Sequence, residues 1–430
     1  MAVLIFVAVF VVLYRGAVDR RAAMLAGAAA MVVVGGAWNF YSVEQAIGSI
    51  YFETLALIFG MSAATDLLSR SGFFARVAGR VVAHADGNRW LALVLLSLVT
   101  YVISLFANNL SAMLIMLPMT LALCRDMGLR PAPVLAAEIV ASNLGGASTM
   151  VGDFPNMIIA SAARLSFLDF IGGMMVPCLM LLAAMLWYFG TQRKGVRLAV
   201  GQAKESFQAG VPARSDQRGT RLGLSIMVGM LIGFLSADLL GVRPAWVAIV
   251  GGVAAVVASH GGKEADDWFA ACGGEDILYF AGLFVMVGGL AAAGVLDGLG
   301  WVIAQAGGGN ALAGMVVLMW MAAGVTLFLS AGPATAFFIP LAEQMYVDVS
   351  DVTVWWALSL GVLAGSSGTL TGATAGSLVE THLERFFVRH PSVTGGANHG
   401  LDFKGYLRWG MPIMGIFLAL STLYVIASAG

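Results

Sequence analysis

Charged residues are scarce in this sequence, and so are groups that bind metals or form disulfides. Only 11% of its 430 residues are charged, against about 25% in a typical soluble domain. The formal net charge is −1 and no basic block exceeds a few residues, so nucleic acid is not an expected partner. Cys124, Cys178 and Cys272 are far apart and lack metal-ligand spacing, which predicts neither a disulfide framework nor a metal site.

Catalytic and nucleotide-binding motifs are missing too. The sequence has no P-loop, so any use of ATP would have to come from a soluble partner docked on the cytoplasmic loops. A Ser/His pair inside a membrane is not expected, because every histidine lies in a loop: His84, His260, His382, His390 and His399. We therefore expect neither an enzyme nor a cofactor.

Long apolar segments dominate what is present. Hydrophobic residues make up 60% of the chain and the mean hydropathy is +0.89. About 20 apolar residues cross the ~30 Å hydrocarbon core of a bilayer, so the sequence predicts an all-α polytopic membrane protein. The expected spans are 2–14, 22–40, 50–68, 132–163, 170–190, 222–239, 244–259, 276–292, 352–380 and 409–429.

Two further apolar stretches, 90–124 and 311–345, are each too long for one span and are interrupted in the middle. We interpret them as re-entrant helical hairpins that enter and leave on the same side. With this arrangement 21 of the 23 Lys and Arg residues fall on one side, leaving only Arg164 and Arg243 opposite. Positive loops remain in the cytoplasm, which predicts that both termini are non-cytoplasmic. The acidic loop 260–276 argues mildly against this orientation.

Residues of the first half recur about 222 positions later. Glu53 and Gly60 match Glu275 and Gly282, and after a two-residue shift Gly152 matches Gly372. The pattern predicts a first repeat at 1–190, a cytoplasmic linker at 191–221 and a second repeat at 222–430. Five spans is an odd number, so the second repeat would be inverted in the membrane. Inverted repeats with broken helices are typical of secondary transporters.

Polar residues in the first half occur where its helices should break. Asn108, Asn109 and Ser111 lie in the middle of the first hairpin, where a helix start would offer free N–H groups to an anion or polar ligand. A second break is predicted in 141-ASNLGGASTMVGDFPN-156, because irregular backbone at membrane depth is tolerated beside a cavity or inside protein.

Two acids accompany the second break. An ionised acid at the bilayer centre costs at least ~2.5–3.5 kcal/mol, so each needs a cation, a proton or strong donors. Asp153 and Glu138 are therefore candidates for proton coupling. The alternatives are that Asp153 caps the second half-helix and that Glu138 is a partly hydrated structural acid.

The second half keeps the breaks but changes their chemistry. Its hairpin tip and broken span provide hydroxyls without a carboxylate or amide, and Ala373 stands opposite Asp153. If the site uses titratable groups, they are confined to the first half. The hydroxyl candidates are Ser330, Thr335, Ser366, Ser367 and Thr369.

At these residues the chain resembles the ion transporter superfamily, in particular the branch with ArsB-type arsenite permeases, NhaD-type sodium/proton antiporters and the melanosomal P protein. The resemblance rests on 107-ANNLSAMLIMLP-118, 142-SNLGGASTMVGDFPN-156, 166-SFLDF-170, 282-GLFVMVGGLAAAGVL-296 and 355-WWALSLGVLAGSSGTLTGATA-375. It implies scaffold and transport domains drawn from both repeats, a homodimer, and elevator-type alternating access. It also implies a bacterial cytoplasmic membrane, or a magnetosome membrane derived from it.

The resemblance also implies site residues. The first-half set is Asn108, Asn109, Ser111, Asn143, Thr149, Asp153 and Asn156, with Asn109, Asn143 and Asp153 as ligands if the ion is sodium, and the hydroxyls above form its counterpart. Family members usually carry an Asp/Asn or Asn/Thr pair at the second hairpin tip and an Asn in the second broken span. Here Ser330, Ala331 and Ser367 stand in those places, which argues against a second cation site.

The leading hypothesis is a proton-coupled transporter of a small inorganic ion, either a cation/proton antiporter or an exporter of a small oxyanion such as arsenite. No Arg or Lys is expected at the cavity positions, which disfavours a multivalent anion. The alternatives are a sodium-coupled dicarboxylate or anion permease and a passive channel.

Overall fold

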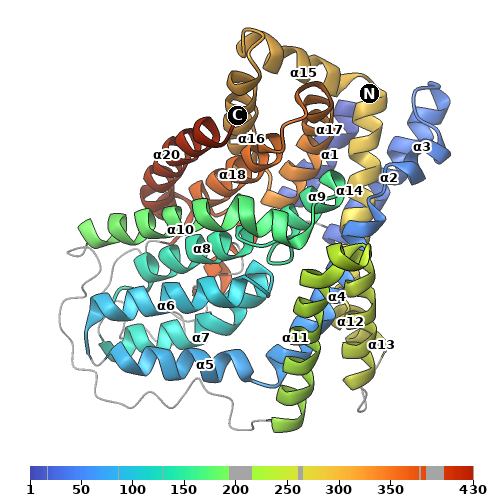
Figure 1. Ribbon diagram of the computed structural model, residues 1–430. Helices are drawn as coiled ribbons and strands as arrows, with labels where there is room; N and C mark the ends of the chain where they lie inside the picture. Colours follow the sequence, from blue (N-terminus) through green and yellow to red (C-terminus); the bar gives the residue numbers. More distant parts are fainter. Residues whose placement is uncertain are drawn as a thin grey trace.

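Long apolar helices form nearly all of the described structure (Figure 1). The computed structural model describes residues 1–16, 18–85, 87–127, 129–192, 216–259, 265–376, 379–383 and 401–429. The first-half helices are α1 (Ala2–Arg15), α2 (Arg20–Ala37), α3 (Val43–Gly48), α4 (Phe52–Arg70), α5 (Phe73–Val82), α6 (Arg89–Ser104), α7 (Asn109–Met127), α8 (Pro131–Ala147), α9 (Phe154–Ala163) and α10 (Phe167–Thr191), with a short 3₁₀ helix, η1, at Ala83–Ala85. The second-half helices are α11 (Gln217–Leu240), α12 (Pro244–Ala258), α13 (Ala265–Ala271), α14 (Gly274–Ala292), α15 (Val295–Ala306), α16 (Ala311–Thr326), α17 (Ala331–Val349), α18 (Thr353–Gly368) and α20 (Phe403–Ser428).

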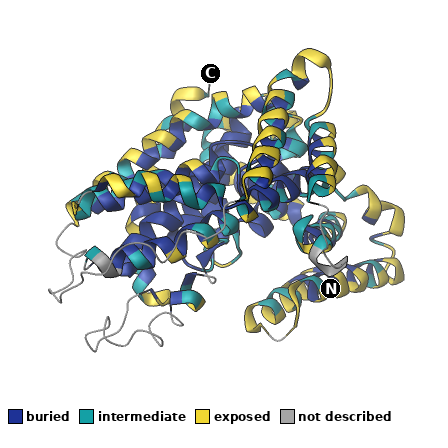
Figure 2. Ribbon diagram, turned by 90° about the horizontal axis from the view of Figure 1, so that it is seen from below, coloured by how far each residue is buried: buried dark blue, intermediate teal, exposed yellow. Residues whose placement is uncertain are grey.

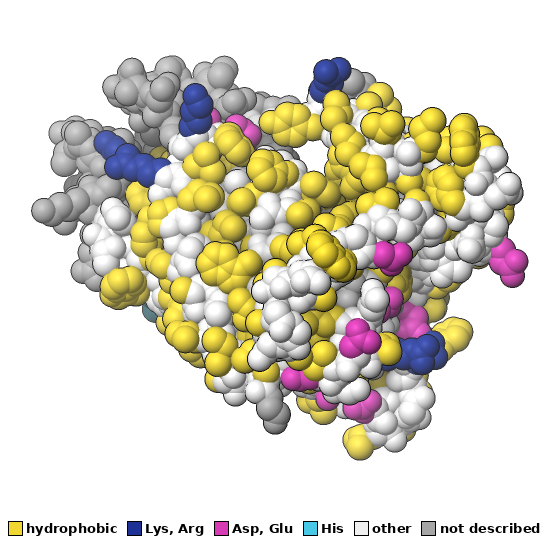
Figure 3. Space-filling model, turned by 90° about the horizontal axis from the view of Figure 1, so that it is seen from above, with side chains coloured by type: hydrophobic (Ala, Val, Ile, Leu, Met, Phe, Trp, Pro, Cys, Tyr) yellow, Lys and Arg dark blue, Asp and Glu magenta, His cyan; other side chains and the backbone are white. Residues whose placement is uncertain are grey.

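The surface of these helices is suited to lipid. Six helices in the described ranges are long and apolar enough to cross a membrane: α2, α4, α10, α11, α14 and α20. Large apolar side chains point outward from them, including Val33 and Leu239. Hydrophobic side chains also cover much of the face in Figure 3. Such a surface would be an aggregation hazard in water, and the chain is a multi-pass membrane protein.

The helices pack into two bundles. In the first, α4 packs against α11 and α12, and α14 packs against α2. In the second, α8 and α18 are surrounded by α6, α7, α10, α16, α17 and α20, and α9 packs on α17. Figure 1 shows α4, α11 and α12 on one side of the molecule and α6, α7 and α8 on the other. Each bundle therefore combines helices from both halves of the chain.

The spacing of the helices repeats along the chain. The helices α4, α5, α6, α7 and α8 each begin 222 residues before α14, α15, α16, α17 and α18, respectively. Their contacts match as well, because α4 meets α12 at Gly60 and Ala248, whereas α14 meets α2 at Gly282 and Met24. Glycine lets the two backbones approach closely at each crossing.

Ion pairs lie beside both crossings. Glu53 on α4 pairs with Arg243, the residue that precedes α12. Arg20 at the start of α2 pairs with Asp276 on α14 at 2.7 Å. Asp19 caps α2, and a hydrogen bond from the Arg21 side chain lowers the pKa of Asp19 to about 2.

The predicted interruptions are present. The stretch 90–124 contains α6 and α7 with a break at 105–108, and 311–345 contains α16 and α17 with a break at 327–330. The predicted span 132–163 is divided at 148–153, and α18 ends at Gly368 within the predicted span 352–380.

Some short elements were not predicted. The helices α3, α5, α13 and α15 lie where the sequence predicts loops, and α11 begins inside the predicted linker 191–221. An amphipathic pattern marks α5, in which Phe74, Ala78 and Val82 are buried. Linker residues 193–215 lie outside the described residues, as do His260, His390 and His399.

Candidate functional site

Two buried helices, α8 and α18, carry the breaks that form the site. Every residue of both helices is buried, and Figure 2 shows that buried residues, in dark blue, fill the interior of the molecule. A helix that is apolar all round belongs in a core. Both helices end in the middle of the second bundle, so the backbone beyond them has to find partners inside the protein.

The two breaks share one backbone geometry. A Cβ atom at Gly152 would lie 2.6 Å from the carbonyl oxygen of Ser104, and one at Gly372 would lie 2.7 Å from that of Thr326. Glycine is therefore needed where each break passes the end of a neighbouring helix. The hydroxyl of Thr149 donates to Leu105 O at 2.7 Å, and that of Thr369 donates to Leu327 O at 2.9 Å.

Asp153 is the acid at the first break and is 6% exposed. Its Oδ1 accepts from the backbone N–H of Phe154 at 2.9 Å, so it caps α9. Its Oδ2 accepts from Asn109 Nδ2 at 2.7 Å. In the described part of the chain no Lys, Arg or His forms an ion pair with Asp153.

Asn109 joins this acid to the rest of the first-half site. Its Nδ2 also donates to Asn143 Oδ1 at 3.1 Å, and its Oδ1 accepts from Ser104 Oγ at 2.7 Å. Asn143 Nδ2 in turn donates to Ser366 O at 3.2 Å. This network links the first hairpin, both parts of the first broken segment and α18.

Asn156 makes a second link between the halves. Its Nδ2 donates to Gly146 O at 2.9 Å and to Thr149 O at 3.3 Å, and its Oδ1 accepts from Ser359 Oγ on α18 at 2.9 Å. The amide therefore satisfies one carbonyl oxygen at the end of α8 and one inside the first break.

In the described part of the second break, hydroxyl groups donate hydrogen bonds to backbone carbonyl oxygens. The hydroxyls of Ser366 and Ser367 donate back to Leu363 O. The fully buried Tyr406 on α20 donates to Ser367 O at 3.2 Å. Tyr406 was missed by the sequence analysis, although a tyrosine in an apolar helix needs a partner for its hydroxyl.

The remaining predicted residues lie outside these networks. Asn108 Oδ1 accepts from Ser111 N at 2.8 Å and so caps the start of the helical segment that follows. Thr335 donates to Ala331 O within its own helix, at 2.8 Å. Ser330 lines a cavity. Glu138 is in a separate cluster with Thr100 and Thr120.

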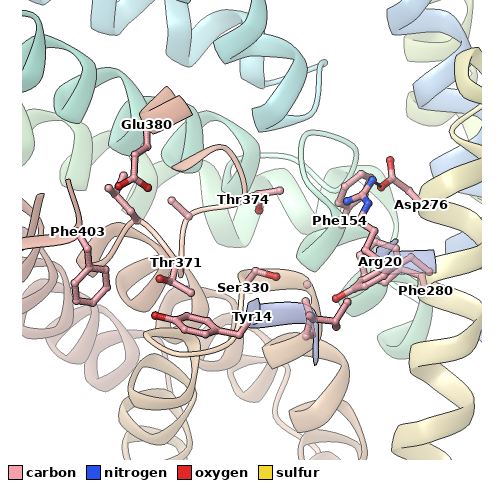
Figure 4. Close-up of a pocket in the computed structure, with 16 residues that line it drawn as sticks. Tyr14, Arg20, Phe154, Asp276, Phe280, Ser330, Thr371, Thr374, Glu380 and Phe403 are labelled. Carbon is pink, nitrogen blue, oxygen red and sulfur yellow. Dashed lines mark hydrogen bonds and ion pairs between the residues drawn. The ribbon is translucent and has the colours of Figure 1, made fainter. Parts of the chain in front are cut away.

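A cavity of about 610 Å³ opens beside the second hairpin tip and the second break (Figure 4). Ser330 and Thr371 line one part, and Arg20, Asp276 and Phe154 line another. Phe154 follows Asp153 and packs on Phe280 at 5.1 Å between ring centroids, so the cavity reaches the residue next to the buried acid. Arg20 was not among the residues expected at the site, and the fold brings it to this cavity.

Paired hairpins, broken helices and a buried acid together define a secondary transporter. The chain belongs to the CitMHS citrate transporter family, whose sequence model matches residues 3–361. This agrees with the superfamily that the motifs resemble, and it makes the protein a membrane transporter and not an enzyme.

Individual relatives cover the whole chain. The magnetosome protein MamN of Magnetospirillum gryphiswaldense is 46% identical over 435 residues, covering 99% of this chain and 98% of the relative. An uncharacterized transporter of Mycobacterium tuberculosis is 29% identical over 436 residues, covering 99% and 97%. The crystal structure of the Alcanivorax borkumensis YdaH transporter matches with a TM-score of 0.61 at 13% identity, covering 94% of this chain and 96% of that chain.

Proposed function

We propose that this protein is a proton-coupled secondary transporter of a small inorganic ion in which Asp153 binds the coupling proton. The observation that carries the proposal is a carboxyl group that is 6% exposed and lies at a helix break, and whose donors among the described residues are Asn109 and the Phe154 N–H. Two neutral donors offset only part of the cost of burying a charge. Binding a proton or a cation therefore stabilises the buried carboxyl group. The group releases the bound proton or cation when water or the cargo enters the site.

Alternating access through an elevator-type movement fits the same geometry. The 222-residue spacing of five helix pairs supports two repeats, 1–190 and 222–430, of inverted topology, joined by the linker 191–221. The first bundle would be the scaffold and dimer interface, and the second would carry the breaks and the two re-entrant hairpins. The cavity beside Ser330 and Phe154 would give the site access from one side. Both termini would be non-cytoplasmic, and the name of MamN favours a magnetosome membrane.

The test is the response of reconstituted protein to pH steps on a solid-supported membrane. Asp153→Asn keeps a good helix cap and removes the titratable group, so we expect folded protein without pH-driven current. Asp169→Asn is the matched control, because Asp169 belongs to the capping box that Ser166 begins at the start of α10, away from the breaks. Full pH-driven current in Asp153→Asn would refute the proposal. Screening sodium, arsenite and phosphate-like anions then identifies the cargo.

A second candidate is sodium-coupled transport of a carboxylate anion. Arg20 in the cavity and the description of the family as citrate transporters favour it. Two observations argue against it. Arg20 already pairs with Asp276 at 2.7 Å, and the cavity is lined by acidic side chains as well as by hydroxyl groups. Strong thermal stabilisation by citrate or succinate would favour this candidate over the first. Single-channel conductance in planar bilayers would instead favour a passive channel.

A further inference from the structure

Glu138 is an acid that the Asp153 network does not use. It lies in the middle of α8 and is 0% exposed. Its Oε1 accepts from Thr120 on α7 at 2.8 Å and from Thr100 on α6 at 3.3 Å. Its Oε2 is buried without a hydrogen-bond partner among the described residues. The side chain therefore points into the contact between α8 and the first hairpin.

The charge of an ionised Glu138 would have no counter-ion. In the described ranges none of the ion pairs includes it, and the titratable group that faces it is the Cys124 thiol on α7. Three of the helices packed against α8 carry other titratable side chains, none of which forms a hydrogen bond or ion pair with Glu138 in the described part of the chain: Arg89 and Tyr101 on α6, Asp169, Cys178 and Tyr188 on α10, and Lys404, Tyr406, Arg408 and Tyr424 on α20. A lone buried carboxylate is strongly unfavourable.

Neither protonation state satisfies this carboxyl fully. In either state Oε2 has no hydrogen-bond partner among the described residues, and a buried polar atom without a partner is unfavourable. The anion accepts from the Thr120 hydroxyl, whereas the single hydrogen of the Thr100 hydroxyl is shared with Leu96 O at 2.8 Å, and among the described residues the anion has no ion-pair partner. If Glu138 only accepted hydrogen bonds from Thr100 and Thr120, a neutral side chain could take its place. Buried polar atoms without a partner, such as Oε2, also call for an explanation in a native protein.

We propose that Glu138, with the hydroxyls of Thr100 and Thr120, is a second proton-binding site that exchanges its proton independently of Asp153. Hard metal cations take six or more oxygen ligands in many protein sites, whereas this cluster offers the carboxyl group and two hydroxyls. The ligand is therefore the proton itself. Binding forms one O–H bond on the carboxylate, and release returns the proton to water.

The experiment is an infrared titration of the purified full-length protein, in which a protonated buried carboxyl gives a carbonyl band that disappears on ionisation. We expect the wild type to show a titrating band that Glu138→Gln removes and Asp153→Asn keeps. Thr120→Val, which preserves shape and removes one donor, should shift the same band. In a pH-jump, Glu138→Gln should take up one proton fewer per molecule than the wild type.

A second variant and a sodium control allow the infrared titration to refute the proposed proton site at Glu138. If Glu138→Gln does not fold, the titration is read in Asp153→Asn, with Thr120→Val assigning the Glu138 band. A Glu138 band that stays constant over the pH range in which the protein is folded would refute the second site, even if Asp153→Asn abolishes pH-driven current. A band that disappears on replacing choline by sodium at constant pH would make the ligand sodium and would also refute it.

Discussion

Asn109 is the residue at which the polar groups of the first half converge. It donates to Asp153 at 2.7 Å and to Asn143 at 3.1 Å, and it accepts from Ser104 at 2.7 Å. The side chain is buried, so none of these partners has water as a ready substitute. Its neighbour Asn108 has a different task, because it caps the backbone N–H of Ser111.

Asn109→Ala and Asn108→Ala form a matched pair that separates coupling from stability. Asn109→Ala leaves buried groups unpaired at a cost of about 1–3 kcal/mol, and we expect it to change the pH dependence of transport. Asn108→Ala removes a cap worth about 0.5–2 kcal/mol, so it should lower the melting temperature and leave that pH dependence unchanged. Thermal melting and pH-step currents measure the two effects. Equal pH profiles in both variants would contradict the role given to Asn109.

At the scale of the helices, the crossing of α4 with α12 is tighter than that of α14 with α2. A Cβ atom at Gly60 would overlap the backbone of Ala248, whereas one at Gly282 would lie 3.1 Å from the backbone of Met24. Gly415 on α20 has no such neighbour within 4 Å. Close packing of small residues is a main source of helix association in lipid.

These three glycines predict a graded response to alanine. Gly60→Ala should destabilise the protein by about 1–3 kcal/mol through overpacking. Gly282→Ala should have a smaller effect, and Gly415→Ala should be neutral or stabilising because alanine has the higher helix propensity by about 1 kcal/mol. Melting temperatures in detergent provide the comparison. A Gly60→Ala variant as stable as Gly415→Ala would contradict the packing argument.

The elements that sequence could predict are those with a strong local signal. The breaks at 105–108 and 148–153 were expected because Asn and Gly occur where an apolar helix should continue. The helices α5 and α15 were missed because 10 and 12 residues are too few to be recognised as spans. Their starts did carry a signal, since Gly72 and Gly294 are 222 positions apart and both have positive φ.

The parts that sequence could not predict depend on contacts between distant segments. Arg20 was counted as a loop charge, and only the fold brings it to the cavity beside Ser330. The link from Asn143 to Ser366 O spans 223 positions in sequence, so no local pattern could indicate it. Glu138 was expected to be partly hydrated if structural, and it is instead fully buried between three helices.

At the scale of the whole molecule, hydrogen bonds from the start and the middle of α4 join the two bundles. Tyr51 at the start of α4 donates to Glu343 on α17 at 3.0 Å. Thr65 on α4 donates to Phe106 O, in the break between α6 and α7, at 3.2 Å. If one bundle moves against the other, these contacts have to break and reform.

Cross-linking tests this movement. In a Cys272→Ser background, a short bifunctional thiol reagent applied to Tyr51→Cys with Glu343→Cys should stop pH-driven current, because it joins the bundles. The control is Glu53→Cys with Arg243→Cys, which joins α4 to the residue before α12 within the first bundle. We expect current to persist there. Undiminished current in the first cross-linked pair would exclude relative movement of the bundles at this point.

The glycine crossings have a mechanical consequence. Backbones that touch directly, as at Gly60 and Ala248, leave no compliant side chains to slide over one another. We therefore expect the four helices α2, α4, α12 and α14 to behave as one rigid unit. If one bundle moves against the other during transport, we expect the change to be accommodated where aromatic rings such as Phe154 and Phe280 meet, since side chains can change rotamer while the closely packed backbones cannot.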